Sequence, residues 1–323
     1  MKMDPVKFLF YLFNIHLGYT SSQAINNRPI IGVLAQKPYS GMLDGLQDKN
    51  YTSYVTASYV KWLEAAGARV APILTYQPYE YYVNITSSIN GILLPGGESS
   101  ITNSSGYGQA ADIIYNQVLE INSGGTYLPL WGTCLGMEEL LYLAAGHQDW
   151  LTPCSALNKA DPLMLEEGFE QSRIFKDMPI DVLRSLYYYN STINFHSFCM
   201  TKENMMESGM AQSFKMLTTN LDYQGLEYVS TMEHKELPIF GVQWHPEENP
   251  YEWADDEDHS NTPHSKEAIL VSQYFGNFIV GQARLNNQTF ASKEAEEGSL
   301  IYNHQPTYVY PWSPSSMQVY LFR

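Results

Sequence analysis

The sequence predicts an α/β protein with three layers, in which helices cover both faces of a mostly parallel sheet that continues into antiparallel strands. In the first half of the chain, short apolar runs alternate with amphipathic helical segments, as in parallel strands joined by crossover helices. In the second half, three strand-like runs follow one another with only turns between them, which favours antiparallel pairing. A turn bracketed by glycines lies between one predicted strand and the next helix, and it indicates the position of the candidate catalytic residues.

Residues 1–24 have the pattern of a signal peptide, and residues 25–323 are expected to form one domain. Two lysines precede the apolar run 8–17, which is too short to cross a bilayer, and a small-residue cleavage pattern ends at Ala24. We therefore expect a protein of the secretory pathway, destined for the lysosome or the extracellular space. With 323 residues, 44% of them hydrophobic, the chain can bury a large core.

The first half of the chain supplies alternating strands and helices to the sheet. Apolar runs predict strands at residues 29–35, 70–74 and 91–94, and a fourth that begins at Tyr127. Helices are expected at residues 53–66, 79–88 and 106–121, and a fourth directly after Cys134. The first of these helices places Trp62 and Leu63 on one apolar face, and Gly67 is positioned as its C-terminal stop.

The second half is expected to extend the sheet and to close the domain. Residues 145–212 look irregular and rich in loops. Beyond them, strands are expected at residues 214–218, 226–232 and 238–244, a helix at 264–280, and packed extended structure over 308–323. Ligands of such sheets bind at the carboxyl ends of the strands, where both Cys134 and the turn at Pro95 lie.

The segment around Cys134 has the form of a nucleophile elbow. Gly132 and Gly136 bracket the cysteine, and small neighbours are what a sharp strand-to-helix turn requires. At the start of a helix, the thiolate of Cys134 is stabilised by the helix dipole, and the Leu135 N–H points to where a substrate oxyanion forms. The alternative is a buried structural cysteine in an ordinary turn.

A cysteine nucleophile needs a base and a group that orients the base, and residues 241–247 offer both. His245 and Glu247 lie two positions apart after a predicted strand, so their side chains can point to the same side. Glu247 can then reach one nitrogen of His245 while the other nitrogen faces Cys134. The alternative is a core histidine beside a solvated glutamate; the combination with the elbow favours a Cys-His-Glu triad.

Charge and glycosylation patterns limit the partners of this protein. The formal net charge is −16, which argues against nucleic acid and anionic membrane surfaces and is compatible with an acidic compartment. Five asparagines occupy glycosylation acceptor patterns, which predicts surface positions: Asn50, Asn84, Asn103, Asn190 and Asn287. Of the three cysteines, Cys134 is the expected free thiol, while Cys154 and Cys199 are either paired or both reduced.

The sequence contains no pattern that predicts a metal or a cofactor. The acidic run 255–258, followed by His259, lacks the ligand spacing of a calcium loop and is interpreted as a solvated turn. The other histidines outside the triad segment form no metal-ligand pattern either. We therefore expect catalysis by side chains and backbone alone.

Several motifs resemble those of one enzyme family. WGTCLG (131–136), PGG (95–97) and QWHPE (243–247) are similar to the class I glutamine amidotransferase-like fold, which has a flavodoxin-like core. Within this fold the chain resembles the gamma-glutamyl hydrolases, which remove γ-linked glutamates from folate polyglutamates. Further matching stretches are PIIGVLAQK (29–37), ASYVKWLEAAGARV (57–70), NFH (194–196), LTTN (217–220), STMEH (230–234) and HPEENPYEW (245–253). The resemblance covers nearly the whole chain after the predicted signal peptide.

This resemblance implies a catalytic role for each residue that it matches. Cys134 would be the nucleophile, His245 the general base and then the general acid, and Glu247 the group that orients the histidine. The N–H groups of Gly97 and Leu135 would form the oxyanion hole. The implied reaction is hydrolysis of folate and antifolate poly-γ-glutamates through a γ-glutamyl thioester.

The resemblance also implies a substrate pocket and a homodimer. His196, Tyr59 and Glu138 would line that pocket. The expected substrate is a polyanion, yet the loop 98–107 contains no arginine or lysine. Recognition would then depend on other donors, with Lys37, Lys61 and Lys202 as candidates, or on a pH low enough to neutralise glutamates.

Two other functions stay open at this stage. One is a glutaminase that delivers ammonia to a synthase, which ammonia release from glutamine would reveal. The other is a secreted glycoprotein that has kept the fold without activity. A normal, slowly reacting thiol at Cys134 would support this second function. The intact set of Cys134, His245 and Glu247 favours the hydrolase.

Overall fold

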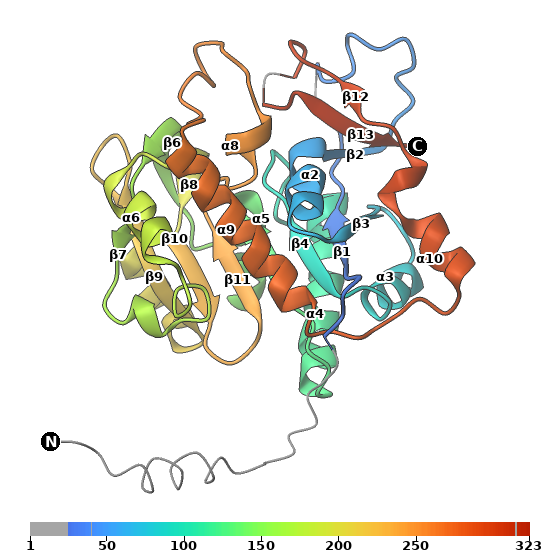
Figure 1. Cartoon of the computed structure of the whole chain (residues 1–323), viewed down its shortest axis with the longest axis horizontal. Helices are drawn as coiled ribbons and strands as arrows, with labels where there is room; N and C mark the ends of the chain where they lie inside the picture. Colours follow the sequence, from blue (N-terminus) through green and yellow to red (C-terminus); the bar gives the residue numbers. More distant parts are fainter. Residues whose placement is uncertain (1–24, 40, 314) are drawn as a thin grey trace, which may run out of the picture.

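An eight-stranded sheet forms the centre of the molecule, in the order β3-β1-β4-β5-β11-β10-β9-β7 (Figure 1). The computed structural model describes residues 25–39, 41–313 and 315–323, so the predicted signal peptide lies outside the described residues. The parallel strands are β1 (Ile30–Leu34), β3 (Arg69–Ile73), β4 (Gly91–Leu94), β5 (Leu130–Thr133) and β11 (Ile239–Val242). The antiparallel strands are β7 (Met164–Leu165), β9 (Phe214–Leu221) and β10 (Glu227–His234). The predicted fold class is therefore confirmed.

Helices cover both faces of the sheet because successive residues of its strands point to opposite sides. On β1, Ile31 and Val33 pack into one hydrophobic core and Ile30 and Leu34 into the other. The first core lies under α2 (Ala57–Ala65), α6 (Ile180–Tyr188) and α9 (Lys266–Ala283). The second lies under α3 (Tyr79–Thr86), α4 (Gly106–Ser123) and α5 (Leu135–Ala144). Shorter helices are α7 (Lys202–Glu207), α8 (Glu248–Tyr251) and α10 (Lys293–Ser299).

A small sheet joins two distant parts of the chain beside the central sheet. It has the order β12-β13-β2, formed by Thr307–Tyr308, Gln318–Phe322 and Ser53–Thr56. The helix predicted over 53–66 is therefore wrong in its first turn, which is extended. Its residues Tyr54, Val55 and Thr56 favour strands, and pairing with β13 supplies the hydrogen bonds that a helix would have supplied.

The prediction that residues 145–212 are irregular is also wrong. This region contains α6 and α7 and a two-stranded sheet of β6 (Thr152–Asp161) and β8 (Thr192–Cys199). The pairing of β6 with β8 has two register shifts, which break the alternation of apolar and polar residues by which strands are detected. A disulfide between Cys154 and Cys199 links the two strands, so the pairing that the sequence left open is present.

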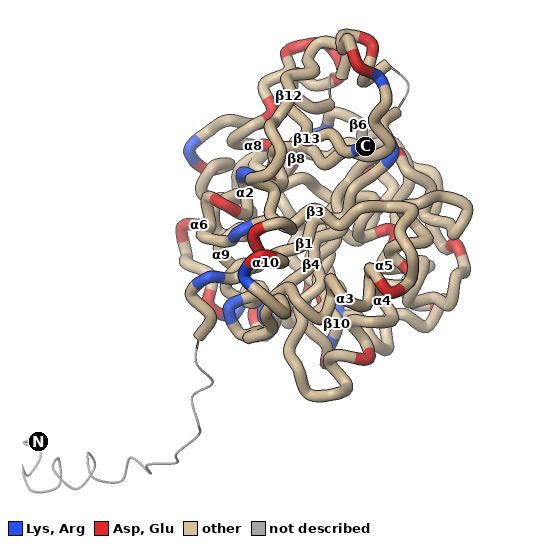
Figure 2. Tube along the Cα trace, turned by 90° about the vertical axis from the view of Figure 1, so that its right-hand side faces the viewer, with Lys and Arg blue, Asp and Glu red and all other residues tan. Residues whose placement is uncertain are grey.

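Most charged residues among those described are at least partly exposed. Acidic residues are distributed over many elements (Figure 2). Lysines and arginines are fewer, in keeping with the net charge of −16. All five asparagines of the glycosylation patterns are exposed. Among the described residues, no helix combines the length and apolar character that a membrane span requires.

Candidate active site

Cys134 lies between β5 and α5, in a strained turn. Its φ of 51° and ψ of −112° are values that residues other than glycine rarely adopt. The flanking glycines make this turn possible. A Cβ on Gly136 would lie 2.0 Å from the Leu94 carbonyl oxygen, and a Cβ on Gly132 would lie 2.5 Å from the backbone of Gly136. The predicted nucleophile elbow is thus present in the backbone.

The thiol of Cys134 is buried but has polar neighbours. Only 5% of the residue is exposed, and Sγ lies 3.9 Å from the Phe195 carbonyl oxygen and 3.9 Å from Gln243 Nε2. Burial raises the pKa of the Cys134 thiol above its ordinary value. The adjacent His245 and the backbone N–H of Leu135 act against this rise, because both favour the thiolate.

His245 follows β11 and is held by two carboxylates. Its Nδ1 lies 2.7 Å from Glu247 Oε1 and 3.2 Å from Glu248 Oε1, and all three side chains are buried. Burial by itself lowers the pKa of the imidazole, but the charges of the two glutamates and the thiolate outweigh it and raise the pKa well above its usual value. The other ring nitrogen, Nε2, has no hydrogen-bond partner in the described part of the chain.

The turn at residues 95–97 brings the backbone next to these two side chains. A Cβ on Gly96 would lie 2.6 Å from His245 Cε1 and 3.1 Å from Cys134 Cβ, so only glycine fits. The N–H of Gly96 donates to the hydroxyl of Tyr59 at 2.7 Å. The structure therefore brings together the predicted residues Cys134, His245, Glu247, Gly97, Leu135 and Tyr59.

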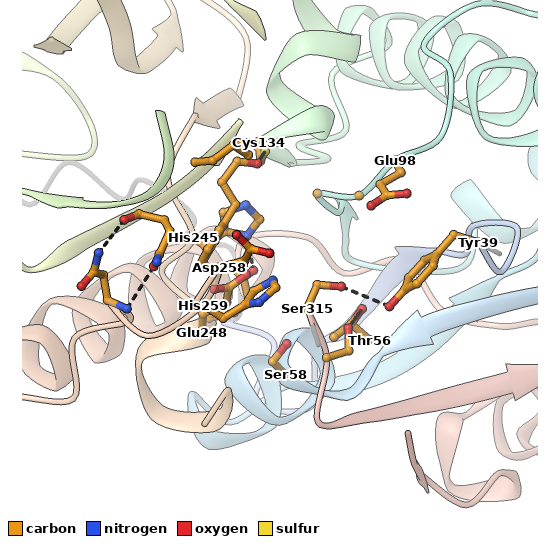
Figure 3. Close-up of a pocket in the computed structure, with 18 of the residues that line it drawn as sticks. Tyr39, Thr56, Ser58, Glu98, Cys134, His245, Glu248, Asp258, His259 and Ser315 are labelled. Atoms are coloured by element: carbon orange, nitrogen blue, oxygen red, sulfur yellow. Dashed lines mark hydrogen bonds and ion pairs between the residues drawn. The ribbon is translucent and has the colours of Figure 1, made fainter. Parts of the chain in front are cut away.

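A cavity of about 610 Å³ opens in front of Cys134 and His245 (Figure 3). Its wall combines tyrosines and hydroxyl groups with five acidic side chains: Glu98, Glu247, Glu248, Glu257 and Asp258. None of the described residues that line it is a lysine or an arginine. In Figure 3, His259 and Asp258 lie near His245, and Tyr39 and Ser315 lie across the cavity from them.

Two predicted pocket residues do not lie on the cavity wall. On β8, Phe195 lines the cavity, so the next residue, His196, points the other way. Its Nδ1 lies 3.1 Å from the Phe198 carbonyl oxygen and close to both sulfurs of the disulfide, and burial lowers its pKa to about 3. Glu138 lies behind Cys134, where its Oε1 accepts a hydrogen bond from Gln243 Nε2 at 2.9 Å.

The structure adds residues that sequence reasoning missed. The run 255–258 is not merely a solvated turn, because Asp258 and His259 line the cavity and the His259 ring packs against Phe195 at 5.3 Å. Ser315 and Ser316 reach the same cavity from the segment before β13. The one available signal was chain proximity, since the acidic run follows His245 by only about ten residues.

Comparisons with known proteins point to one enzyme family. Residues 29–247 match the family Peptidase C26. The chain is 39% identical to gamma-glutamyl hydrolase B of Dictyostelium discoideum, over 98% of this chain and 88% of that protein. It is 41% identical to the gamma-glutamyl hydrolase of Homo sapiens, over 91% of this chain and 90% of that protein.

Solved structures include a similar chain in PurLQS from Thermotoga maritima, at 13% identity and a TM-score of 0.43, covering 76% of this chain and 97% of that one. The matched family segment spans more than half of this chain and ends at Glu247, so it includes Cys134 and His245. The chain belongs to the Peptidase C26 family, together with the gamma-glutamyl hydrolases.

Proposed function

We propose that this chain hydrolyses γ-glutamyl bonds with Cys134 as the nucleophile. The observation that carries this proposal is the meeting of a strained, buried Cys134 with a histidine that two carboxylates hold, at the inner end of a large cavity. Relatives at 39–41% identity are named gamma-glutamyl hydrolases, which supports the bond type.

The reaction begins with proton transfer from Cys134 to His245 and attack of the sulfur on the γ-carbonyl carbon. The N–H groups of Leu135 and Gly97 stabilise the oxyanion of the tetrahedral intermediate. His245 then gives its proton to the departing amine, and a γ-glutamyl thioester remains on Cys134. Water attacks the thioester with His245 as base, which releases the γ-glutamyl carboxylate and restores the thiol.

Glu247 and Glu248 orient His245 for both proton transfers. Their oxygens lie 2.7 Å and 3.2 Å from Nδ1, so Nδ1 keeps its proton and Nε2 remains for the thiol and the leaving group. The carboxylates also stabilise the imidazolium that forms after the first transfer. This accounts for the two acidic side chains at the base of the cavity.

The proposed substrate is a folate poly-γ-glutamate, as the family resemblance implies. Tyr39, Tyr54 and Tyr223 on the cavity wall offer aromatic surface. The five acidic side chains on the same wall would repel a polyanion when ionised. Substrate binding should therefore be tighter at acidic pH, at which glutamates of the substrate and of the wall are partly neutral, whereas proton transfer from Cys134 requires the neutral imidazole of His245.

The test of the proposal is release of glutamate or short polyglutamates from pteroyl poly-γ-glutamates, measured between about pH 4 and 8. Replacement of the nucleophile, Cys134→Ala, should lower kcat by about 10⁴-fold or more while leaving the melting temperature nearly unchanged. Turnover by the alanine variant at the rate of the unmodified protein would refute the mechanism. Ammonia release from free glutamine in place of γ-glutamyl cleavage would support a glutaminase instead.

We also propose that the protein enters the secretory pathway and acts in the lysosome or outside the cell. The exposed asparagines of five glycosylation patterns and the disulfide between Cys154 and Cys199 support this proposal. Removal of N-linked glycans from the protein isolated from its own cells should lower its mass. The homodimer that the resemblance implies stays a prediction, for which light scattering of the purified protein is the measurement.

A further inference from the structure

Gln36 is a buried polar residue that the proposed mechanism does not use. It follows β1, only 3% of it is exposed, and its Nε2 donates a hydrogen bond to the Gly96 carbonyl oxygen at 2.6 Å. Its own backbone is fixed as well, because its N–H and C=O form hydrogen bonds of 2.9 Å and 2.7 Å with Tyr54. The side-chain amide is therefore held against the turn that contains Gly97.

The geometry of the peptide between Gly96 and Gly97 sets the direction of the Gly97 N–H. In a trans peptide, the carbonyl oxygen and the following N–H point to opposite sides. The carbonyl oxygen points to Gln36, so the Gly97 N–H points away from Gln36, to the side of the Gly96 Cα. On that side, a Cβ added to Gly96 would lie 3.1 Å from Cys134 Cβ. The N–H therefore lies on the side of the turn that faces Cys134.

The other side of Gly96 is held by Tyr59. This residue belongs to α2, and its hydroxyl accepts the hydrogen bond of the Gly96 N–H at 2.7 Å. Two side chains from different elements therefore fix the turn. Gly97 has a φ of +153°, which glycine alone adopts readily, and a Cβ there would lie 2.1 Å from Gln36 Oε1. The peptide between two glycines can flip easily. These two hydrogen bonds therefore have to hold it in one orientation.

We propose that Gln36 is a positioning residue that keeps the Gly97 N–H directed into the oxyanion hole. This inference rests on the proposed function. Gln36 contacts Gly96 and not the substrate, so its effect is to preorganise a donor whose full strength is needed only in the transition state. Its Oε1 is buried without a hydrogen-bond partner among the described residues, so the hydrogen bond to Gly96 is the polar contact that the side-chain amide makes.

The first test is Gln36→Met, which keeps the length of the side chain and removes the donor. We expect kcat on a γ-glutamyl substrate to fall about 10- to 100-fold, because loss of an oxyanion donor costs about 10²- to 10³-fold and a misdirected donor costs less. KM should change by less than about threefold, since ground-state contacts remain. The matched control is Gln117→Met, at a buried glutamine on α4 away from the cavity, which should leave both constants unchanged.

A second variant, Gln36→Glu, distinguishes positioning from packing. A protonated carboxyl can donate to the Gly96 carbonyl oxygen, whereas a carboxylate repels that oxygen and favours the flipped peptide. The kcat of this variant relative to the unmodified protein should therefore rise as the pH falls. A γ-glutamyl aldehyde forms a tetrahedral hemithioacetal with Cys134 whose oxygen occupies the oxyanion hole, so it should lose affinity for Gln36→Met in parallel with kcat.

Three results would overturn the inference. They are an unchanged kcat in Gln36→Met, a pH-independent activity ratio for Gln36→Glu, and undiminished aldehyde affinity in a variant of low kcat. If Gln36→Met does not fold, the pH-dependent ratio of Gln36→Glu decides alone. Failure of the proposed function is a separate result, since it requires that the unmodified protein cleave no γ-glutamyl substrate.

Discussion

Of the three lysines considered for substrate binding, Lys37 is the one best placed to meet the carboxylates of the proposed polyglutamate. Lys202 is engaged with Glu166 at 2.9 Å, and Lys61 donates to Gln318 at 2.6 Å. Lys37 has no ion pair or side-chain hydrogen bond within the described part of the chain, and it lines a side cavity of about 350 Å³. This side cavity shares Tyr39, Tyr54 and Glu98 with the main cavity, so the two adjoin.

We expect Lys37→Met to reduce the preference for long substrates. A second or third γ-linked glutamate that extends into the side cavity would place its carboxylate beside Lys37. Lys37 is exposed and solvent screens its charge, so loss of this ion pair should cost at most about 1 kcal/mol, or up to roughly fivefold in kcat/KM. The measurement compares pteroyl di-γ-glutamate with pteroyl penta-γ-glutamate. Lys202→Met, at a lysine that is already paired, is the control. Equal losses on both substrates in Lys37→Met would contradict this role.

The residues that could be predicted from the sequence are those whose chemistry demands a fixed residue type within a short segment. Cys134 stands out between two glycines, and Glu247 stands two positions after His245. The second carboxylate on the histidine, Glu248, could not be distinguished from a solvated neighbour. The sequence also could not show that the His196 side chain points away from the cavity. The alternation of side chains on β8 can be assigned only once the position of that strand is known.

At the scale of elements, β6 and β8 form a small two-stranded layer that makes up part of the cavity wall. The disulfide joins their ends across 45 residues of sequence, and Phe195 on β8 contributes to the cavity wall. Closing a loop of that length in the unfolded chain lowers its entropy, which stabilises the folded state. The layer therefore depends on a covalent link as well as on its ladder of hydrogen bonds.

The double variant Cys154→Ala/Cys199→Ala should lose about 2–4 kcal/mol of unfolding free energy. Both sulfurs are removed together, so that Cys134 is the only thiol present, as it is in the unmodified protein. Urea unfolding followed by tryptophan fluorescence gives the value. An unfolding free energy equal to that of the unmodified protein would mean that the strands alone hold this layer.

The elements that could not be predicted share one physical cause. The alternation of β6 is interrupted where its pairing with β8 shifts register, and β2 depends on a partner strand at the far end of the sequence. Local periodicity contains neither kind of information. The strands and helices of the parallel half were predictable because their apolar residues repeat with the period of their own structure.

At the scale of the whole molecule, the protein combines a net charge of −16 with several buried carboxyl groups. Burial raises the pKa of Glu138 to about 7 and that of Glu139 to about 8. Both oxygens of Glu139 are buried without a hydrogen-bond partner among the described residues. The folded protein therefore holds protons that the unfolded chain, with glutamate pKa values of about 4.3, releases.

The free energy of unfolding should fall as the pH rises from about 5 to 8. The folded pKa values lie above the unfolded ones, so this stability is complete below about pH 4.3 and is lost as the pH passes 7 to 8. Glu139→Gln stays neutral and should regain, at pH 8, up to about 1.4 kcal/mol for each unit of the raised pKa.

Urea unfolding at the two pH values measures this effect, with Glu207→Gln at an exposed carboxylate as the control. A stabilisation by Glu139→Gln that is the same at pH 5 and pH 8 would contradict the assignment. So would a control variant that reproduces the pH-dependent gain.

The pairing of β2 with β13 has a consequence for how the protein becomes active after it is made. Thr56 and Ser316 both line the cavity and lie next to each other, although 260 residues separate them in the chain. Contacts of such long sequence separation carry a large loop-closure cost and form late in folding. The nucleophile elbow is built from neighbouring residues and can form early. The reactive thiol should therefore exist before the substrate cavity is complete. During refolding, enzymatic activity should return later than secondary structure.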